Sequence, residues 1–181
     1  MKNEKTLISA IDIGTSKICV LIANYSQNNS IEILGIGQSK SIGINKGIVV
    51  NINETVNAIN NAIEEAENQS GEKIDSCTIG ISGEHIRGIN NIGVIMVKSN
   101  NQEIDNNDIK RVLKHAQTIT LPLEKRILHV LSQNYKVDDQ TGIKDPLGMI
   151  GHRLETKVHL VISEVARERN ITKCIDQVGL D

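Results

Sequence analysis

Two apolar runs separated by only three residues place the strongest constraint on this fold. Thr6 to Ile13 is almost continuously apolar, and the run from Lys17 to Asn24 follows directly after Gly14-Thr15-Ser16. A link this short joins antiparallel neighbours, because a parallel pair needs a crossover of about a dozen residues or more. A third apolar run, Ile31 to Gln38, follows after another short polar stretch. The sequence therefore predicts an antiparallel meander of three strands.

A helix and a fourth strand are predicted after the meander. Ser41 to Gly47 contains two glycines and is expected to be a loop. Asn53 is the predicted N-cap of the helix, with Glu54 favourably placed in its first turn, and Gly71 is the predicted stop. Asp75 to Ser82 is the predicted fourth strand. One face of the helix carries apolar residues at steps of three and four: Val56, Ile59, Ile63 and Ala66.

The order β-β-β-α-β is that of a half-domain of the actin and ribonuclease-H type, so the predicted fold class is α/β (α+β). The pattern changes after Ser82-Gly83. Strands are expected at Ile89 to Val97, Ile127 to Val137 and Glu155 to Ser163, with an amphipathic helix around Val112. These elements form a β-α-β-β module over residues 84–162.

Two further segments complete the predicted fold. Asp138 to Gly151 contains three glycines and a proline, so we expect a long irregular connection. A final helix places Ile171, Cys174, Ile175 and Val178 on one face and ends at Gly179.

Composition and charge exclude several classes of function. The net charge is −2, aromatic residues make up 1% of the chain, and no dense run of lysine or arginine occurs. We therefore expect no binding of nucleic acid and no polybasic membrane anchor. The longest apolar stretch, Ile18 to Ala23, is much shorter than the roughly 20 residues of a membrane-spanning helix. Cys19, Cys77 and Cys174 form no Cys-x-x-Cys motif, which favours a reduced, cytoplasmic protein with buried thiols.

The first hairpin carries the residues best suited to bind a phosphate group. Gly14 allows backbone N–H groups to approach a phosphate closely, Thr15 and Ser16 add hydroxyl donors, and Lys17 adds positive charge. Asp12 could hold Mg²⁺ directly or through a water molecule. A plain turn explains the same residues, because glycine, threonine and serine are common in turns and a strand-end aspartate can cap one.

A nuclease of the ribonuclease-H type is a second interpretation of the same topology. It would need several carboxylates around two metal ions, and Asp12 could be joined by Glu64, Glu65 or Glu67 of the helix. Against it, the fourth strand ends in Ile81-Ser82-Gly83 without a carboxylate, and the three glutamates are more simply the solvated face of the helix. The histidines show no metal-ligand spacing, and two of them are expected to be half-buried in strands, namely His129 and His159.

The sequence also resembles a known family. Asp12-Ile-Gly-Thr-Ser-Lys17 is similar to the first phosphate motif of the actin, Hsp70 and sugar-kinase superfamily. Further segments recur in the same order in the FtsA family of bacterial actin-like cell-division proteins. These segments are Ile36-Gly37, Gly43 to Gly47, Ile81 to Ile86, Arg126 to Val130, Gln133 to Tyr135, Gly142 to Gly148 and Lys157 to Leu160.

This resemblance implies a domain organisation and a function. Residues 1–83 would be the first part of the actin-like subdomain 1A, residues 84–162 an inserted SHS2-type subdomain 1C, and residues 163–181 the return to 1A. Members of the family bind ATP with Mg²⁺, form actin-like polymers, tether the FtsZ ring to the cell membrane and recruit later division proteins. The chain would then be an adaptor rather than an enzyme, with at most a weak ATPase activity in the full-length form.

The resemblance also assigns roles and partners. Gly14, Thr15 and Ser16 would hold the ATP phosphates, Asp12 would organise Mg²⁺ and Lys17 would add charge. Self-association would use actin-like contacts and 1C, and 1C would recruit the later division proteins. The expected location is the cytoplasm, at the inner face of the cell membrane at the division site for the full-length protein. An alternative is another actin-like ATPase, such as a PilM-type pilus-assembly protein, and a second alternative is a free-standing interaction module of the 1C type.

The chain stops at Asp181, which sets the expectations for the isolated chain. The family's second phosphate loop, FtsZ-binding subdomain and terminal amphipathic helix are not in this sequence. If an absent lobe contributed about 4 kcal/mol, a micromolar ATP site would become a millimolar one. We therefore expect weak or undetectable ATP binding by this chain, and binding of FtsZ and membrane only by the full-length protein. Asp75 to Ser82 is expected to be an open sheet edge.

Overall fold

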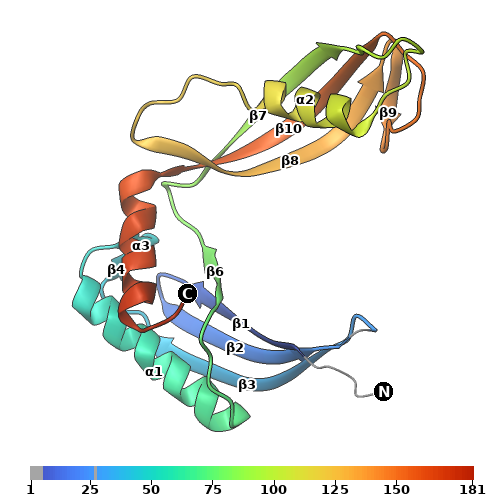
Figure 1. The fold of residues 1–181 in the computed structure, drawn as a ribbon. Helices are drawn as coiled ribbons and strands as arrows, with labels where there is room; N and C mark the ends of the chain where they lie inside the picture. The colour runs from blue at the N-terminus through green and yellow to red at the C-terminus, as the bar shows by residue number, and fades with distance from the viewer. Residues whose placement is uncertain (1–5, 27) are drawn as a thin grey trace. The chain divides into compact units, whose positions relative to one another are not determined.

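The computed structural model describes residues 6–26 and 28–181 and shows two compact units (Figure 1). Unit 1 contains the described residues up to His85 together with Ala166–Asp181, and unit 2 contains Ile86–Val165. Unit 2 is therefore inserted into unit 1 along the sequence. The mixed α/β class predicted from the sequence is confirmed. No helix among the described residues is both long enough and apolar enough to cross a membrane.

Unit 1 is built on a four-stranded sheet. Its strands are β1 (Thr6–Ile13), β2 (Lys17–Tyr25), β3 (Ile31–Lys40) and β6 (Thr78–Ile81), in the order β3-β2-β1-β6. β1, β2 and β3 pair in antiparallel fashion, whereas β6 is parallel to β1. The predicted meander is thus confirmed. The fourth strand is shorter than the predicted Asp75 to Ser82.

Two helices pack on one face of this sheet: α1 (Ile52–Ser70) and α3 (Val165–Gln177). They bury the alternate strand residues that point to them, among them Ile11, Val20 and Ile22. Burial of apolar surface stabilises a fold by about 25 cal/mol per Å². The face of the sheet under the two helices is therefore the core of unit 1. The opposite face of the sheet is left without a helix from the described part of unit 1.

The ends of α1 differ in one respect from the prediction. Asn51, not Asn53, is the N-cap, and its side chain accepts a hydrogen bond from the backbone N–H of Glu54 at 3.2 Å. Asn53 lies inside the first turn. Gly71 ends the helix in the left-handed conformation at φ 75°, as predicted, because glycine has no Cβ to oppose that conformation.

α1 lies unusually close to β3 at two glycines. A Cβ atom added to Gly37 would lie 1.9 Å from the carbonyl oxygen of Ala62, and one added to Gly35 would lie 2.3 Å from that of Ala66. Both contacts involve backbone atoms of the helix, which cannot move aside as a flexible side chain can. The two glycines therefore determine how closely α1 can pack on the sheet.

Two short segments depart from the prediction. The expected loop from Ser41 to Gly47 contains the first strand of a small antiparallel ribbon, β4 (Ile44–Asn45), and β5 (Ile48–Val49) follows directly after it. The terminal residue Asp181 makes two backbone hydrogen bonds: it donates to Asp75 and accepts from the N–H of Cys77. Asp75 to Cys77 is therefore not the open edge that we expected, whereas β6 itself is the terminal strand of the sheet.

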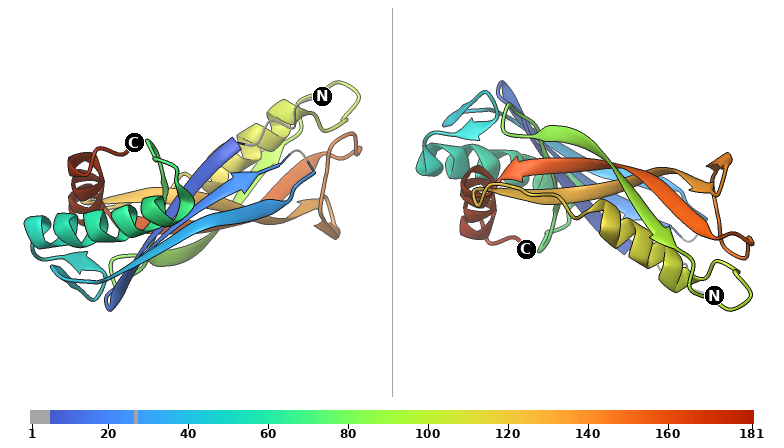
Figure 2. Two further views of the ribbon diagram at one scale, coloured as in Figure 1. Left: turned by 90° about the horizontal axis from the view of Figure 1, so that it is seen from below. Right: turned by 90° about the horizontal axis from the view of Figure 1, so that it is seen from above.

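Unit 2 has a second four-stranded sheet, entirely antiparallel (Figure 2). Its strands are β7 (Arg87–Met96), β8 (Lys125–Val137), β9 (Gln140–Ile143) and β10 (Arg153–Glu164), in the order β7-β10-β8-β9. α2 (Asn106–Ala116) packs on one face, where it buries residues such as Val112 against the sheet. The other face carries side chains such as Lys157 and is not covered by a helix of unit 2.

A capping box starts α2. The side chain of Asp105 accepts a hydrogen bond from the backbone N–H of Asp108, and the Asp108 side chain accepts one from the N–H of Asp105. Gly93 of β7 allows the other end of the helix to approach, since a Cβ there would lie 2.3 Å from the carbonyl oxygen of Val112. α2 is thereby held close to β7.

The predicted irregular connection from Asp138 to Gly151 is partly wrong, because it contains β9. Asp138 and Asp139 form a tight turn that returns the chain from β8 to β9, with Asp138 at φ 51°. Aspartate tolerates this left-handed conformation better than most residues do. The Asp138 carboxylate also accepts hydrogen bonds from the backbone N–H groups of Arg153 at 2.9 Å and His152 at 3.1 Å. Unit 2 is therefore a β-α-β-β-β module with one strand more than predicted.

The close approach of α1 to β3 gives a first prediction. Gly37→Ala would force the helix backbone away from the sheet, so we expect it to lower the free energy of unfolding by about 2–3 kcal/mol. Gly80→Ala is the matched control, because its Cβ would meet no atom closer than 3.4 Å. Urea denaturation measures both variants. Equal stabilities for the two would show that the contact at Gly37 is not a packing constraint.

The Asp138 carboxylate gives a prediction about pH. The hydrogen bonds from the N–H groups of Arg153 and His152 hold the pKa of Asp138 below its ordinary value of 3.8. Because the pKa is lower in the folded than in the unfolded chain, this stabilisation is complete above about pH 5 and is lost as the pH falls through the lowered pKa. Asp138→Asn should therefore lower the melting temperature at pH 7, and the difference from the unaltered chain should shrink towards pH 3.

The neighbouring substitution Asp139→Asn is the control for this experiment, since no hydrogen bond to the Asp139 carboxylate is described. It should change the melting temperature little at either pH. If Asp138→Asn lowers the melting temperature equally at pH 7 and at pH 3, the ionised Asp138 carboxylate is not the source of the stabilisation.

Candidate functional site

The turn between β1 and β2 is shaped by Gly14. Its backbone N–H donates a hydrogen bond to the carbonyl oxygen of Lys17 at 3.1 Å, which closes the turn. A Cβ atom on Gly14 would lie 2.8 Å from the same oxygen, so any other residue would push the turn open. The sequence prediction of a tight glycine turn at the end of β1 is thus correct.

The two hydroxyl residues of the turn are exposed, and the turn is supported from one side. Thr15 Oγ1 accepts a hydrogen bond from the backbone N–H of Gly47 at 3.1 Å, which leaves its own proton available to an anion. The carbonyl oxygen of Ser16 accepts from the N–H of Ser41 at 3.2 Å. The segment Ser41 to Gly47 therefore fixes the turn, a role that the sequence pattern did not indicate.

Asp12 lies on the face of the sheet that no helix from the described residues of unit 1 covers. Its neighbours in the sheet are Cys19 on β2 and Gly80 on β6. Gly80 has no side chain, and the position that its Cβ would take is 3.4 Å from Asp12 Oδ1. The exposed carboxylate of Asp12 is thus accessible on the side of Gly80. A carboxylate that binds Mg²⁺, or a water molecule of its hydration shell, must be accessible in this way. The sequence alone did not indicate the part played by Gly80.

A second lysine lies beside the turn. Lys17 is directly opposite Lys40 of β3 in the antiparallel register, and both side chains are exposed. Like charges opposite each other in a sheet are unfavourable, and an anion bound between them would relieve that repulsion. The register brings Lys40 to the site, and only the pairing of β2 with β3 could have revealed it.

The helix carboxylates proposed for a nuclease lie elsewhere. α1 packs on the face of the sheet opposite to Asp12, so Glu64, Glu65 and Glu67 cannot converge with it on a metal ion. Among the described residues, no group of three or more histidine, cysteine, aspartate or glutamate side chains is placed to hold a metal. The structure therefore gives no support to two-metal nuclease chemistry.

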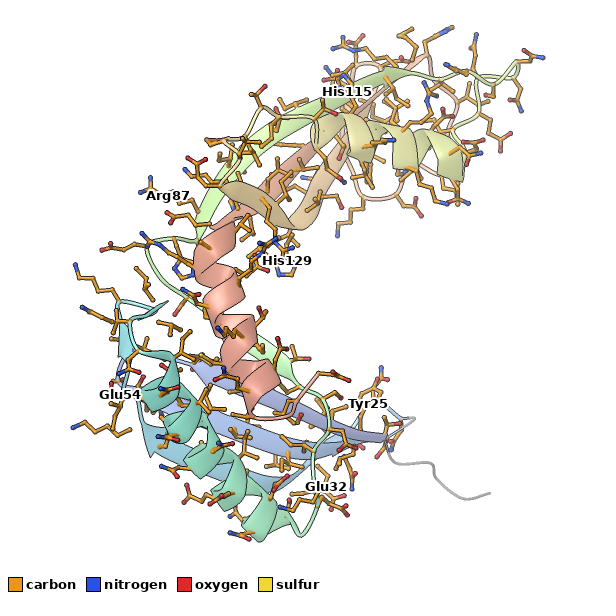
Figure 3. All side chains as sticks on the ribbon, turned by 60° about the vertical axis from the view of Figure 1, so that its left-hand side comes forward. Tyr25, Glu32, Glu54, Arg87, His115 and His129 are labelled. Atoms are coloured by element: carbon orange, nitrogen blue, oxygen red, sulfur yellow. The ribbon has the colours of Figure 1, made fainter. Side chains whose placement is uncertain are left out.

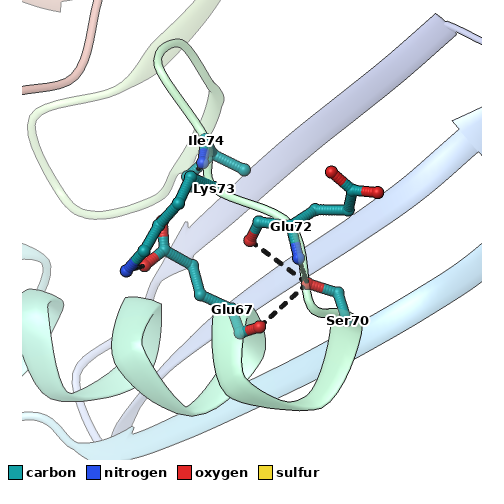
Figure 4. Close-up of polar contacts among 5 residues, drawn as sticks. All are labelled: Glu67, Ser70, Glu72, Lys73 and Ile74. Carbon is teal, nitrogen blue, oxygen red and sulfur yellow. Dashed lines mark hydrogen bonds and ion pairs between the residues drawn. The ribbon is translucent and has the colours of Figure 1, made fainter.

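The prediction that all three glutamates are solvated is wrong for Glu67. This residue is buried, and its carboxylate pairs with Lys73 and accepts a hydrogen bond from the backbone N–H of Ile74 at 3.1 Å (Figure 4). The carbonyl oxygen of Glu67 also accepts from Ser70 Oγ at 3.3 Å. Glu67 thus holds the chain after α1 against the helix and has a structural role.

The two histidines that were predicted to be half-buried differ in exposure. His129 is exposed rather than half-buried (Figure 3). His159 is half-buried, with its Nδ1 2.8 Å from Oδ1 of Asn90. Burial raises the pKa of the Cys77 thiol and also that of Cys174, where nearby Lys173 opposes the effect in part. Thiols with a raised pKa are poor nucleophiles at neutral pH.

The sequence matches known proteins over most of its length. A family model described as the SHS2 domain inserted in FTSA matches residues 83–162. The cell division protein FtsA of Pseudomonas aeruginosa is 43% identical over 175 residues, which are 97% of this chain and 42% of the relative. The chain is related to the FtsA cell division proteins. The residues matched by the SHS2 model include most of unit 2.

Other FtsA proteins agree. FtsA of Borreliella burgdorferi is 39% identical over 97% of this chain and 42% of the relative. FtsA of Neisseria meningitidis serogroup B is 39% identical over 99% of this chain and 43% of the relative. The chain thus spans about two fifths of the length of these relatives, which are named as cell division proteins.

A solved structure shows the same fold. A chain of a PilM-PilN type IV pilus biogenesis complex superposes with a TM-score of 0.59 at 11% sequence identity, covering 96% of this chain and 45% of that chain. At this identity the likeness is one of fold alone.

The burial of Glu67 gives a prediction for unit 1. Glu67→Gln removes the charge that pairs with Lys73 and weakens the bond from Ile74, so we expect the free energy of unfolding to fall by about 1–3 kcal/mol. Glu64→Gln on the exposed face of the same helix should change it by less than about 0.5 kcal/mol. Chemical denaturation compares the two. If Glu64→Gln lowers the free energy of unfolding as much as Glu67→Gln does, the stabilisation comes from negative charge on the helix and not from the buried contacts of Glu67.

Proposed function

We propose that this chain supplies one wall of an ATP site and a partner-binding module to an FtsA-like cell-division adaptor. The observation that carries the proposal is the hairpin at the end of β1. An exposed carboxylate, a closed glycine turn, two exposed hydroxyl groups and a pair of lysines lie at one end of the uncovered sheet face. The relationship to FtsA agrees with this assignment.

Each residue of the hairpin has a distinct role in the proposed site. Gly14, Thr15 and Ser16 would bind the phosphates through backbone N–H and hydroxyl groups, and Lys17 would contribute charge. Asp12 would hold Mg²⁺ directly or through water, and the metal would neutralise part of the phosphate charge when bound. Lys40, opposite Lys17, would lend a second positive charge.

For a full-length FtsA-like protein that contains this chain, the proposed function is that of an adaptor. It binds ATP, assembles into actin-like polymers, tethers the FtsZ ring to the inner face of the membrane and recruits later division proteins through unit 2. It acts at most as a weak ATPase. For the chain of 181 residues alone, weak or undetectable ATP binding stays a prediction, and micromolar binding in calorimetry would contradict it.

A chimera tests the proposed function. The matching segment of FtsA from Pseudomonas aeruginosa is replaced by this chain, and the chimera is the sole FtsA in the cell. We expect it to support division, and Asp12→Ala within it to block division and to weaken Mg²⁺-dependent ATP binding by at least about tenfold, or about 1.4 kcal/mol. The purified chimera provides the binding measurement.

Asp176→Ala is the control, because Asp176 is an exposed aspartate on α3, away from the hairpin. It should leave both division and ATP binding unchanged. If Asp12→Ala binds ATP as well as the unaltered chimera does, the hairpin is a plain turn and the phosphate-binding proposal is wrong.

A further inference from the structure

The outer edge of β7 is a long strand edge along which no other strand of unit 2 pairs. β7 and β9 are the two terminal strands of the sheet, and they have ten and four residues. A terminal strand carries a row of backbone N–H and C=O groups that can pair with another extended chain. β7 is therefore the better template for such pairing.

The register shows which residues of β7 direct their backbone groups outward. The N–H of Val94 donates to Nδ1 of His115 at 3.1 Å, and the carbonyl oxygen of Met96 accepts from Arg111 at 3.2 Å, both from α2. The next residue, Val97, instead donates to the carbonyl oxygen of His152, towards β10. Along an antiparallel strand, the backbone N–H and C=O groups of successive residues point alternately towards one neighbour and away from it. The backbone groups of the even-numbered residues of β7 therefore point away from β10.

α2 thus covers only one half of the edge. His115, which is labelled in Figure 3, and Arg111 satisfy the outward groups at Val94 and Met96. Gly88, Asn90 and Ile92 have the same outward orientation, and no partner for those backbone groups is described. All three residues are exposed. A free template of about five residues, Gly88 to Ile92, therefore remains.

The surroundings of this template are positively charged. β7 contains Arg87 and no acidic residue, and the last turn of α2 carries Lys114. Lys157 of β10 lies directly opposite Ile92. Two acids on the neighbouring elements are already paired: Asp108 with Arg111, and Glu155 with Arg153 and Lys136.

We propose that the edge of β7 from Gly88 to Ile92 binds an extended acidic peptide segment of a partner protein, which adds a strand to the sheet of unit 2. Main-chain hydrogen bonds would supply most of the affinity, and the positive surroundings would select acidic side chains. The exposed side chain of Ile92 offers an apolar contact on the face opposite α2. His115 and Arg111 would limit the added strand to the uncovered half.

The positive charge also argues against a second copy of this chain as the occupant. Antiparallel pairing of two β7 edges would bring the basic ends of both α2 helices towards each other, which costs free energy. The inference deepens the recruitment of partners proposed for unit 2. It does not depend on ATP binding by unit 1.

The probe for this site is a peptide of seven residues that alternates glutamate and valine, titrated into the whole chain without nucleotide. Backbone amide shifts in nuclear magnetic resonance should move at Gly88, Asn90 and Ile92, with a dissociation constant on the order of 100 μM, as expected for a few main-chain hydrogen bonds. The same peptide N-methylated at alternate residues should bind at least about tenfold more weakly, because it cannot donate to the edge.

Variants of β7 and α2 give the second arm. Ile92→Pro removes an outward N–H but no bond to β10, so binding should weaken by about three- to tenfold, whereas Ile92→Thr, which keeps that N–H, should stay within about twofold. His115→Ala frees the N–H of Val94 and should tighten binding by about threefold. If Ile92→Pro fails to fold, the test is the comparison of the plain and the N-methylated peptide, both titrated into the unaltered chain.

Several outcomes would overturn the proposal. These are equal binding of the N-methylated peptide, shifts confined to other elements, or a lysine-valine peptide that binds as tightly as the acidic one. Dimerisation through β7 with no peptide binding would identify a second copy as the occupant instead. Since no nucleotide is present, failure here would leave the ATP site of unit 1 to its own test.

Discussion

The close contact between α1 and the glycines of β3 is the constraint on which the organisation of unit 1 depends. Gly35 and Gly37 let the helix backbone approach the sheet so closely that no other residue fits. With α3 alongside, α1 buries one face of the sheet and leaves the other uncovered. Asp12, Lys17 and Lys40 gather on that other side because strand residues alternate between faces. The location of the proposed phosphate site is therefore a consequence of where the core forms.

Unit 2 solves the same packing problem differently. A single short helix, α2, covers one face of its sheet, and Gly93 brings the end of that helix close to β7. From there His115 and Arg111 reach the strand edge and satisfy two of its backbone groups. A helix of eleven residues is too short to cover the whole of β7, so part of the edge stays open. The packing of the helix thus decides which part of the edge can bind a partner.

Much of the fold could be predicted because local patterns and tertiary packing agree in it. The turn of three residues after Ile13, the apolar face of α1 and the helix stop at Gly71 all follow from elementary rules. The sequence predictions were wrong where two local patterns were equally plausible or where a distant contact decided the outcome. Asn53 and Asn51 are equally good caps by composition, and β9 follows an Asp-Asp turn that the glycine-rich stretch beyond it obscured. Glu67 was assigned to solvent because helical spacing cannot show that the chain after α1 folds back over it.

The sequence by itself determined the order of the longer strands and helices, the glycine turn with its carboxylate and hydroxyl groups, and the relationship to FtsA. These are properties of neighbouring residues or of aligned segments, so they need no knowledge of distant contacts. Only the tertiary structure decided that Lys40 lies opposite Lys17, that Gly80 leaves the Asp12 carboxylate uncovered, and that α2 covers half of the β7 edge. Strand register and helix docking bring together residues that lie far apart in the chain, and local periodicity contains no information about which partners they will meet.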